Sequence, residues 1–228
     1  MDQNNGGFRI IVNANGPYLV LGGVPLVRRY EAQSVFGEPM EWDAVGVEGY
    51  DIPVDGDYEL CRCGQSKNMP FCDKTHQQVG FVGELTADRR LSAERRRSLQ
   101  GSGIKLTDDG ILCSDAGFCG TRLTKAWKML QFSDDPEVRA RIMRMVQNCP
   151  SGRLVAWTPS GQELEPEFRP SIAAVTDGPL WVRGGIPIEA PDGFVYEVRN
   201  RVTLCRCGQS STKPFCDGSH EQIKFSAP

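Results

Sequence analysis

Two copies of one ligand pattern lie 144 residues apart in this chain, and each copy reads C-x-C-x8-C-x3-H. The ligand positions are Cys61, Cys63, Cys72 and His76 in the first copy and Cys205, Cys207, Cys216 and His220 in the second. They account for six of the nine cysteines and for both histidines. Histidines satisfied in a core are the alternative for His76 and His220, but each falls at the fourth position of a metal-ligand spacing. The pattern therefore predicts two metal sites.

The identity of the metal is argued from ligand chemistry. Three thiolates and one imidazole could form a closed tetrahedral zinc site. Zinc motifs usually separate paired cysteines by about two to four residues, whereas one residue separates Cys61 from Cys63 and Cys205 from Cys207. Thiolates suit iron-sulfur clusters as well as zinc, and a cluster of this kind can take four terminal ligands. We expect a 2Fe-2S cluster in each motif, with structural zinc as the alternative.

The two copies also share residues between their ligands, namely Gly64/Gly208, Gln65/Gln209, Ser66/Ser210, Pro70/Pro214, Phe71/Phe215 and Asp73/Asp217. The segment from Cys205 to His220 reads C-x-C-x2-S-x3-P-x-C-D-G-S-H and resembles the CDGSH iron-sulfur family, which includes the mitoNEET-type proteins. The first copy departs from that motif at Lys74 and Thr75. The resemblance implies that the C-x-C pair holds an inner iron and that the third cysteine and the histidine hold an outer one. The expected cluster environment comprises Ser66, Asp73, Lys74, Ser210 and Asp217.

The histidine ligands give such clusters their expected chemistry. Replacing a thiolate by neutral imidazole reduces the negative charge at the cluster and raises its reduction potential, as in Rieske centres. A histidine ring can titrate near neutral pH, and a ligand must be deprotonated to bind a metal. The clusters are therefore expected to be redox-active and acid-labile.

Strand-like segments repeat together with the ligands. Residues 16–26 match residues 178–188 at an interval of 162, so the first copy has 18 more residues before its ligand motif, which we place within Val35 to Tyr50. Short apolar runs between Gly and Pro predict small antiparallel strands, and each unit is too small to bury a full core alone. One-motif members of the family pair as intertwined homodimers. The resemblance thus implies an α+β fold in which two β-rich units form a monomeric intramolecular pseudo-dimer with a shared β-cap.

The two sites are expected to differ at one loop position. Lys74 stands where the second copy has Gly218. A lysine beside the outer iron would favour the reduced state, whereas exposed lysines usually point into solvent. Both interpretations of Lys74 are kept.

The remaining cysteines are Cys113, Cys119 and Cys149, and the last of these opens a Cys-Pro-Ser-Gly run. This stretch resembles single-cluster bacterial ferredoxins and small divergent ferredoxin-like modules, with Asp115 in place of a histidine of the latter. The resemblance implies a third cluster, either 3Fe-4S or a 4Fe-4S completed by Asp115 or water. The alternative is three buried thiols in a module that has lost its cluster, because free cysteine packs well in cores.

Two helices are predicted around these cysteines. Leu123, Ala126, Trp127 and Leu130 follow helical spacing. Ser133, Asp134 and Asp135 are cap candidates before Pro136, and Val138, Ile142, Met145 and Cys149 share one face of the second helix. The inserted module is therefore expected to be α+β.

The predicted organisation has four parts: a first unit at 1–86, a basic helical linker at 87–103, a ferredoxin-like module at 104–165 and a second unit at 166–228. The linker contains Arg89, Arg90, Arg95, Arg96 and Arg97. A solvated helix is the main interpretation, and a docking surface for an acidic redox partner is the alternative.

Composition gives the cellular context. A net charge of −3 offers no general attraction for nucleic acid, no apolar run reaches the length of a membrane helix, and the N-terminus lacks the regions of a signal peptide. Nine cysteines clustered in short motifs suit a reducing compartment. We expect a cytoplasmic protein.

Function follows from the sites. Electron transfer with a redox protein is the leading hypothesis, and storage of a 2Fe-2S cluster with histidine-gated delivery to an apo acceptor is the second. A zinc-stabilised interaction module is the third. An enzyme is not expected, because both histidines are assigned to metal and Gly22-Gly23 and Gly184-Gly185 fit turns or bulges better than a nucleotide-binding fingerprint.

Overall fold

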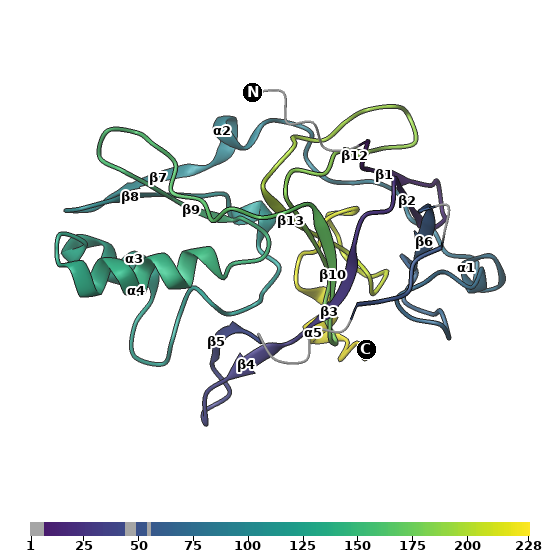
Figure 1. Ribbon diagram of the computed structural model, residues 1–228, viewed down its shortest axis with the longest axis horizontal. Coiled ribbons are helices and arrows are strands. Elements are labelled where there is room, and N and C mark those ends of the chain that lie inside the picture. The colour runs from purple at the N-terminus through teal and green to yellow at the C-terminus, as the bar shows by residue number, and fades with distance from the viewer. Residues whose placement is uncertain (1–6, 44–48, 54–55) are drawn as a thin grey trace.

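Strands from the two ends of the chain share two sheets. The computed structural model describes residues 7–43, 49–53 and 56–228 and shows a strand-rich α+β architecture (Figure 1). The first sheet has the order β12 (Ile188–Glu189), β1 (Arg9–Val12), β2 (Tyr18–Leu21) and β6 (Tyr58–Leu60). The second has the order β13 (Arg201–Leu204), β11 (Leu180–Arg183), β10 (Ser171–Val175) and β3 (Leu26–Arg29). Each sheet thus takes three strands from one end of the chain and its fourth strand from the other.

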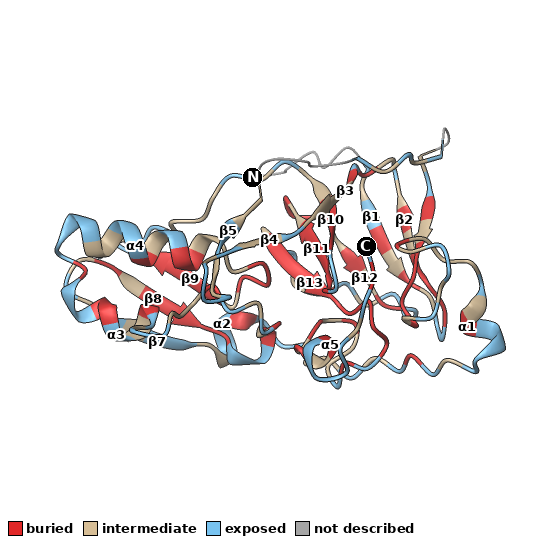
Figure 2. Ribbon diagram, turned by 90° about the horizontal axis from the view of Figure 1, so that it is seen from below, coloured by how far each residue is buried: buried red, intermediate tan, exposed pale blue. Residues whose placement is uncertain are grey.

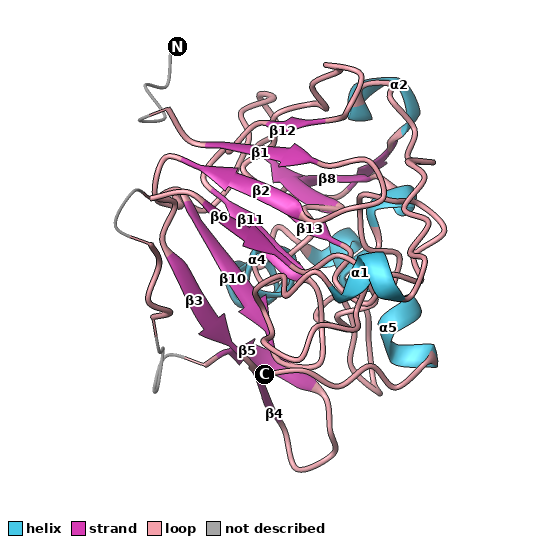
Figure 3. Ribbon diagram, turned by 90° about the vertical axis from the view of Figure 1, so that its right-hand side faces the viewer, coloured by secondary structure: helices cyan, strands magenta, loops and turns pink. Residues whose placement is uncertain are grey.

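The exchanged strands pair in parallel, whereas the other ladders of these sheets are antiparallel. Ile10 lies opposite Ile188 in the first sheet, and Ile172 lies opposite Leu26 in the second. Side chains of both sheets form one core, which includes Ile10, Val12, Val20, Leu60, Ile172, Leu180, Val182 and Leu204. Figure 2 shows buried residues along β10, β11 and β13, and Figure 3 shows the strands of the two sheets alongside one another. Because neither sheet contains strands of one end alone, the two ends fold together.

Two short helices carry the histidines of the ligand motifs. They are α1 (Thr75–Gln78) and α5 (Ser219–Gln222). The Gly22-Gly23 and Gly184-Gly185 pairs directly follow β2 and β11 and have positive φ, as expected for turns or bulges. No helix of the described chain is both long and apolar enough to cross a membrane.

The middle of the chain forms its own layer of three strands and two helices. The strands β7 (Arg97–Gln100), β8 (Lys105–Asp108) and β9 (Leu154–Trp157) are antiparallel, and α3 (Ala126–Met129) and α4 (Pro136–Gln147) lie side by side against this sheet (Figure 1). Two 3-10 turns, Gly110–Leu112 and Leu130–Phe132, complete it. Its core includes Leu106, Ile142, Val146, Leu154 and Ala156. As predicted, Pro136 opens α4, and the Asp135 carboxylate accepts bonds from the first turn.

Two expectations about this region are wrong. The linker is not a long helix: α2 covers only Ser92–Arg95, and residues 97–100 form strand β7, which pairs with β8. Leu123 is 93% exposed and precedes α3, so it does not belong to the apolar face of that helix. In both cases, strand pairing and burial within the middle layer decide the structure, and the helical spacing of residues in the sequence does not.

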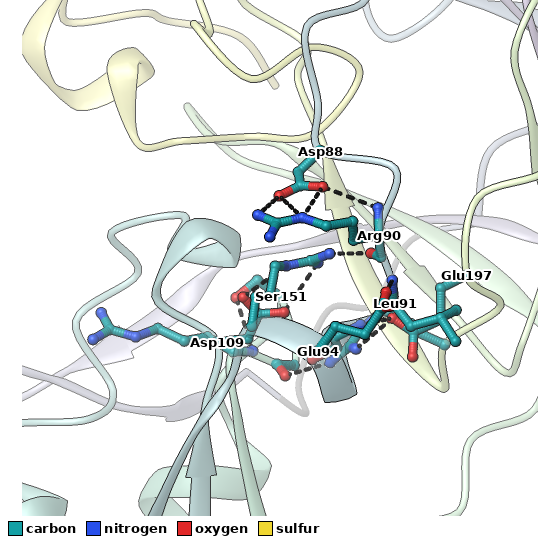
Figure 4. Close-up of polar contacts among 12 residues, drawn as sticks. Asp88, Arg90, Leu91, Glu94, Asp109, Ser151 and Glu197 are labelled. Atoms are coloured by element: carbon teal, nitrogen blue, oxygen red, sulfur yellow. Dashed lines mark hydrogen bonds and ion pairs between the residues drawn. The ribbon is translucent and has the colours of Figure 1, made fainter.

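Four arginines of the linker form ion pairs with carboxylates of this chain. Arg90 contacts Asp88, and the Glu94 carboxylate accepts from the Leu91 backbone at the start of α2 (Figure 4). Three further arginines pair with carboxylates of other segments, in the pairs Arg89–Asp192, Arg95–Asp109 and Arg97–Asp108. These pairs join the segment to the middle layer and to the C-terminal part of the chain.

The extra residues of the first copy form a hairpin of β4 (Glu31–Gln33) and β5 (Pro39–Trp42). The predicted insertion at 35–50 overlaps this hairpin, and its residues 44–48 lie outside the described chain. Trp42 packs on Phe118 of the middle layer and on Trp181 of β11, with ring centroids 4.9 and 4.7 Å apart. The Trp42 indole N–H also donates to Asn148 O at 2.9 Å. The hairpin therefore holds the middle layer against the second sheet.

Asp108 is the charged centre of the middle layer. Its carboxylate has no exposed surface and accepts from Arg153 at 2.7 Å and from Trp127 at 3.2 Å. Burial raises the pKa of Asp108, but the bonds from Arg153, Arg97 and Trp127 outweigh it and lower that pKa overall. The group therefore stabilises the fold above its unfolded pKa of about 3.9, and this contribution is lost as pH falls through its lower folded pKa.

We expect Asp108→Asn to lower the free energy of unfolding by about 3 kcal/mol, because it leaves Arg153 without its buried counter-charge. Urea unfolding followed by tryptophan fluorescence measures the loss. The matched control is Asp192→Asn, which removes an exposed ion pair and should cost less than about 1 kcal/mol. Equal losses in the two variants would show that Asp108 has no special structural role.

Candidate metal centres

Each C-x-C segment presents two thiols at the spacing of ligands of one ion. The Sγ atoms of Cys61 and Cys63 lie 3.7 Å apart, and those of Cys205 and Cys207 lie 3.8 Å apart. All four cysteines are buried. Two thiolates bound at about 2.3 Å to one tetrahedral ion would stand about 3.8 Å apart. The inner cysteine pairs therefore fit one metal position in each motif.

The third cysteine and the histidine form a second pair. Cys72 Sγ lies 3.4 Å from His76 Nδ1, and Cys216 Sγ lies 3.3 Å from His220 Nδ1. A thiolate and an imidazole on one tetrahedral ion would stand about 3.5 Å apart. We name Cys61, Cys63, Cys72 and His76 the first site and Cys205, Cys207, Cys216 and His220 the second site. Each site offers two adjacent pairs, and in the described chain no three Cys, His, Asp or Glu side chains gather as ligands of a single ion.

The aspartate after the third cysteine shapes the loop that carries the ligands. Asp73 accepts from the backbone N–H groups of Lys67 and Thr75, at 2.8 and 3.0 Å. These bonds lower the pKa of Asp73 to about 2. Asp217 accepts from Ser211 and Ser219 in the same way, at 2.7 and 3.0 Å. The aspartate thus joins the two ends of the loop around the third cysteine.

Position 74 and its counterpart 218 turn the chain into the helix that carries the histidine. Lys74 and Gly218 adopt left-handed conformations with φ of 70° and 87°, and each directly precedes its helix. Their backbone N–H groups donate to Cys72 Sγ and Cys216 Sγ, at 3.4 and 3.5 Å. Such bonds stabilise a thiolate. The hydroxyls of Ser66 and Ser210 bond to the carbonyls of Phe71 and Phe215, at 2.6 and 2.7 Å.

Two arginines within the C-x-C segments were not predicted as residues of the sites. Arg62 and Arg206 are each 1% exposed and lie between paired cysteines. Arg62 donates to the carbonyls of Asn13 and Gly16, and Arg206 donates to that of Gly178. The sequence did contain a sign of their role, because both copies of the ligand motif have arginine between the first two cysteines. A buried cation beside thiolates reduces the cost of their negative charge.

The two loops contact each other reciprocally through glycine. A Cβ placed on Gly208 would lie 2.6 Å from the carbonyl oxygen of Cys63, and a Cβ on Gly64 would meet that of Cys207 still more closely. Both glycines have positive φ. Tyr18 of β2 adds a bond across the junction, because its hydroxyl donates to Cys205 O at 2.8 Å and contacts Pro214 O at 3.1 Å. The first and second sites are thus packed back to back.

The three remaining cysteines line one pocket. Cys113, Cys119 and Cys149, which we name the middle site, come together around a small pocket that is partly open to solvent. Burial raises the pKa of the Cys119 thiol, as do Cys149 and Cys113, while Arg153 opposes them. Ser114 lines the same pocket, and its buried hydroxyl has no hydrogen-bond partner among the residues that the structure describes. Three thiols and a free hydroxyl donor fit a sulfur-rich group, whose sulfur atoms would accept that hydrogen bond.

Comparison with known families agrees with this geometry. Residues 15–77 and 177–221 match the family described as the iron-binding zinc finger of CDGSH type. Residues 99–159, between them, match a divergent 4Fe-4S mono-cluster family. No curated protein matches the chain significantly. The resemblance drawn from the motifs is confirmed: the chain carries two CDGSH segments with a divergent 4Fe-4S segment between them, and these families make it an iron-sulfur protein.

Tyr18→Phe tests the bond across the junction of the two sites. We expect the free energy of unfolding to fall by about 1–3 kcal/mol, because buried carbonyls of the second site lose their donor. We also expect faster loss of metal from the second site, measured by iron release to a chelator. Tyr58→Phe is the matched control, since it removes a buried bond to Val24 O outside both ligand loops. Equal rates of iron release in the two variants would contradict a role for Tyr18 at the site.

Proposed function

We propose that this chain is an electron-transfer protein that holds two 2Fe-2S clusters, each with three cysteines and one histidine, and a third cluster in the middle site. The observation that carries the proposal is the pairing of the ligands. In both sites two thiols lie 3.7–3.8 Å apart, and a thiol and an imidazole nitrogen lie 3.3–3.4 Å apart. A 2Fe-2S cluster needs two ligands on each of two irons. One zinc ion would instead draw all four ligands to one point.

The arrangement of the two sites supports an intramolecular pseudo-dimer. Each sheet receives one parallel strand from the opposite end of the chain. Gly64 faces Cys207 as Gly208 faces Cys63, so the contacts between the loops repeat with their partners exchanged. This is the self-complementary pattern of a two-fold interface. We infer that the two exchanged-strand sheets form the shared β-cap expected from one-motif relatives.

The third cluster is proposed from the donor set of the middle site. Cys113, Cys119 and Cys149 supply three thiolates and Ser114 a free hydroxyl. Three thiolates suit a 3Fe-4S cluster, and a 4Fe-4S cluster requires one more ligand. Asp115 also lines this pocket and could supply that ligand, as could water.

Electron transfer fits the placement of the sites better than catalysis. When bound, such clusters supply one-electron redox chemistry. The loops of the first and second sites are in contact, and the loop of the middle site reaches Gly218 of the second. His76 and His220 each lie beside a ligand cysteine, which leaves no histidine as a general base. A redox protein is the proposed partner, and the cytoplasm is the proposed location.

Metal and sulfide content tests the proposal first. Anaerobically purified protein should contain about seven or eight iron and eight acid-labile sulfide per chain if all three sites are filled. About four iron and four sulfide would mean that only the two CDGSH sites hold clusters. Zinc without sulfide would refute the redox function, and such a protein would also be colourless.

His220→Cys tests the redox role of the histidine ligand. A fourth thiolate adds negative charge, so we expect the reduction potential of the second cluster to fall by on the order of 100 mV or more. The potential should also lose its pH dependence, because no imidazole remains to couple protons to electrons. Redox titrations at several pH values measure both effects, with the first cluster as internal reference. An unchanged pH dependence would remove His220 from that role.

A further inference from the structure

The two CDGSH sites differ in exposure although their ligand geometry is the same. Cys72 is partly exposed, whereas Cys216 is 3% exposed. Ser66 is partly exposed, whereas Ser210 is buried. At the turn before the helix the contrast is strongest, because Lys74 is exposed and Gly218 is buried. The second site is therefore covered where the first is open.

The covering segment is the loop of the middle site, residues 113–119. A Cβ placed on Gly218 would lie 2.6 Å from Asp115 Cβ, so the loop touches the turn that carries Cys216 and His220. Ala116 and Pro150 line one pocket together with His220. At the first site the corresponding residue is Lys74, and its ammonium pairs with Glu59 of the same half of the chain. The middle site is thus joined to the second site on the side of its outer ligand pair.

Independent contacts hold this loop in place. Phe118, inside the loop, packs on Trp42 of the inserted hairpin. Arg201 of β13 is 1% exposed and donates to Cys149 O at 2.7 Å and to Val146 O at 2.8 Å, at the end of α4. The same guanidinium is bound to Glu165. Because the hairpin packs on the loop, and β13 holds Cys149 at the pocket that the loop lines, the cover is a fixed part of the fold.

We propose that the loop 113–119 is a cover that shields the turn of the second site and joins that site to the middle site, so that external redox proteins reach the chain at the first site. This inference rests on the proposed function. In each exchange one electron passes between the cluster of the first site and a one-electron carrier protein, and one of the two is oxidised as the other is reduced. The order of sites is then middle, second, first and partner.

Chelation measures the difference in access. Fully loaded protein is incubated at fixed pH with excess ethylenediaminetetraacetate, and the 2Fe-2S clusters that remain are counted by electron paramagnetic resonance after reduction with dithionite. We expect two phases of equal amplitude. The second cluster should be lost at least about tenfold more slowly than the first, because its loss requires local opening of the cover.

Substitutions at positions 74 and 218 show which cluster is lost in the slow phase. Gly218→Lys places a side chain where Asp115 lies, on a backbone that already accommodates lysine at the equivalent position 74. It should displace the cover and accelerate the slow phase at least about tenfold. Lys74→Gly is the matched exchange and should leave the slow phase unchanged. Asp115→Gly, added to Gly218→Lys, removes the opposing Cβ at a residue with φ of 61° and should restore the slow phase.

A second readout needs no substitution. In the loaded chain a paramagnetic middle cluster should accelerate the spin relaxation of one reduced 2Fe-2S cluster more than that of the other. The strongly affected cluster should be the one lost slowly to the chelator.

The outcomes separate this inference from the proposed function. If iron and sulfide show both CDGSH sites filled, but the two clusters are lost at one rate, the cover is refuted and cluster binding stands. A slow phase indifferent to Gly218→Lys, or a fast-lost cluster that relaxes most strongly with the middle cluster, would also refute the cover. Protein without sulfide would refute the proposed function, and the inference would fall with it.

Discussion

The contact on which this architecture depends is the close approach of two cysteine-bearing backbones. The carbonyls of Cys63 and Cys207 lie against glycines of the opposite loop, with no room for a Cβ on either side. The two halves of the chain also share strands, because each sheet takes one edge strand from the other half. The parallel pairs β1–β12 and β3–β10 provide those edges. The contact also sets the first and second sites back to back.

Burying so many thiols in one place has an electrostatic cost. Burial raises the pKa of Cys63 to about 11, so the metal-free thiol keeps its proton at neutral pH. A metal must then displace that proton, which links metal binding to folding and to pH. Arg206 interacts electrostatically with Cys61 and Cys207, so its fixed positive charge offsets part of this cost, and its N–H groups are held by backbone carbonyls. Arg62 donates to two carbonyls of the loop between β1 and β2 and to Gly83 O, so this buried cation ties the first C-x-C segment to the sheet beneath it.

The sequence predicted what is local and periodic. Ligand spacing pointed to the segments that match the CDGSH and divergent 4Fe-4S families, and the cap at Asp135 with Pro136 located α4. Helix α4 ends at Gln147, so Cys149 follows the helix and does not lie on its apolar face as expected. Shared strands were expected only from the resemblance to one-motif relatives; the residues themselves did not predict which strands exchange, because short apolar strands do not specify their partner. The helix expected at 87–103 failed for the same reason, since β8 recruits residues 97–100 into a sheet. Arg62 and Arg206 were missed because a charged residue is usually assigned to the surface, and only its repetition in both copies marked it as buried.

The differences between the two copies have one structural origin, the insertion that only the first copy carries. The hairpin β4–β5 comes from the first half of the chain, yet its Trp42 packs on Trp181 of the second half and on Phe118 of the middle layer. Strand exchange makes this possible, because β3, which leads into the hairpin, already pairs with β10 of the other half. The hairpin therefore packs beside the second site, and its Trp42 also contacts the middle layer there. Glycine at position 218 then becomes a steric requirement, because the neighbouring loop occupies the space of a side chain, whereas position 74 faces solvent and can carry lysine.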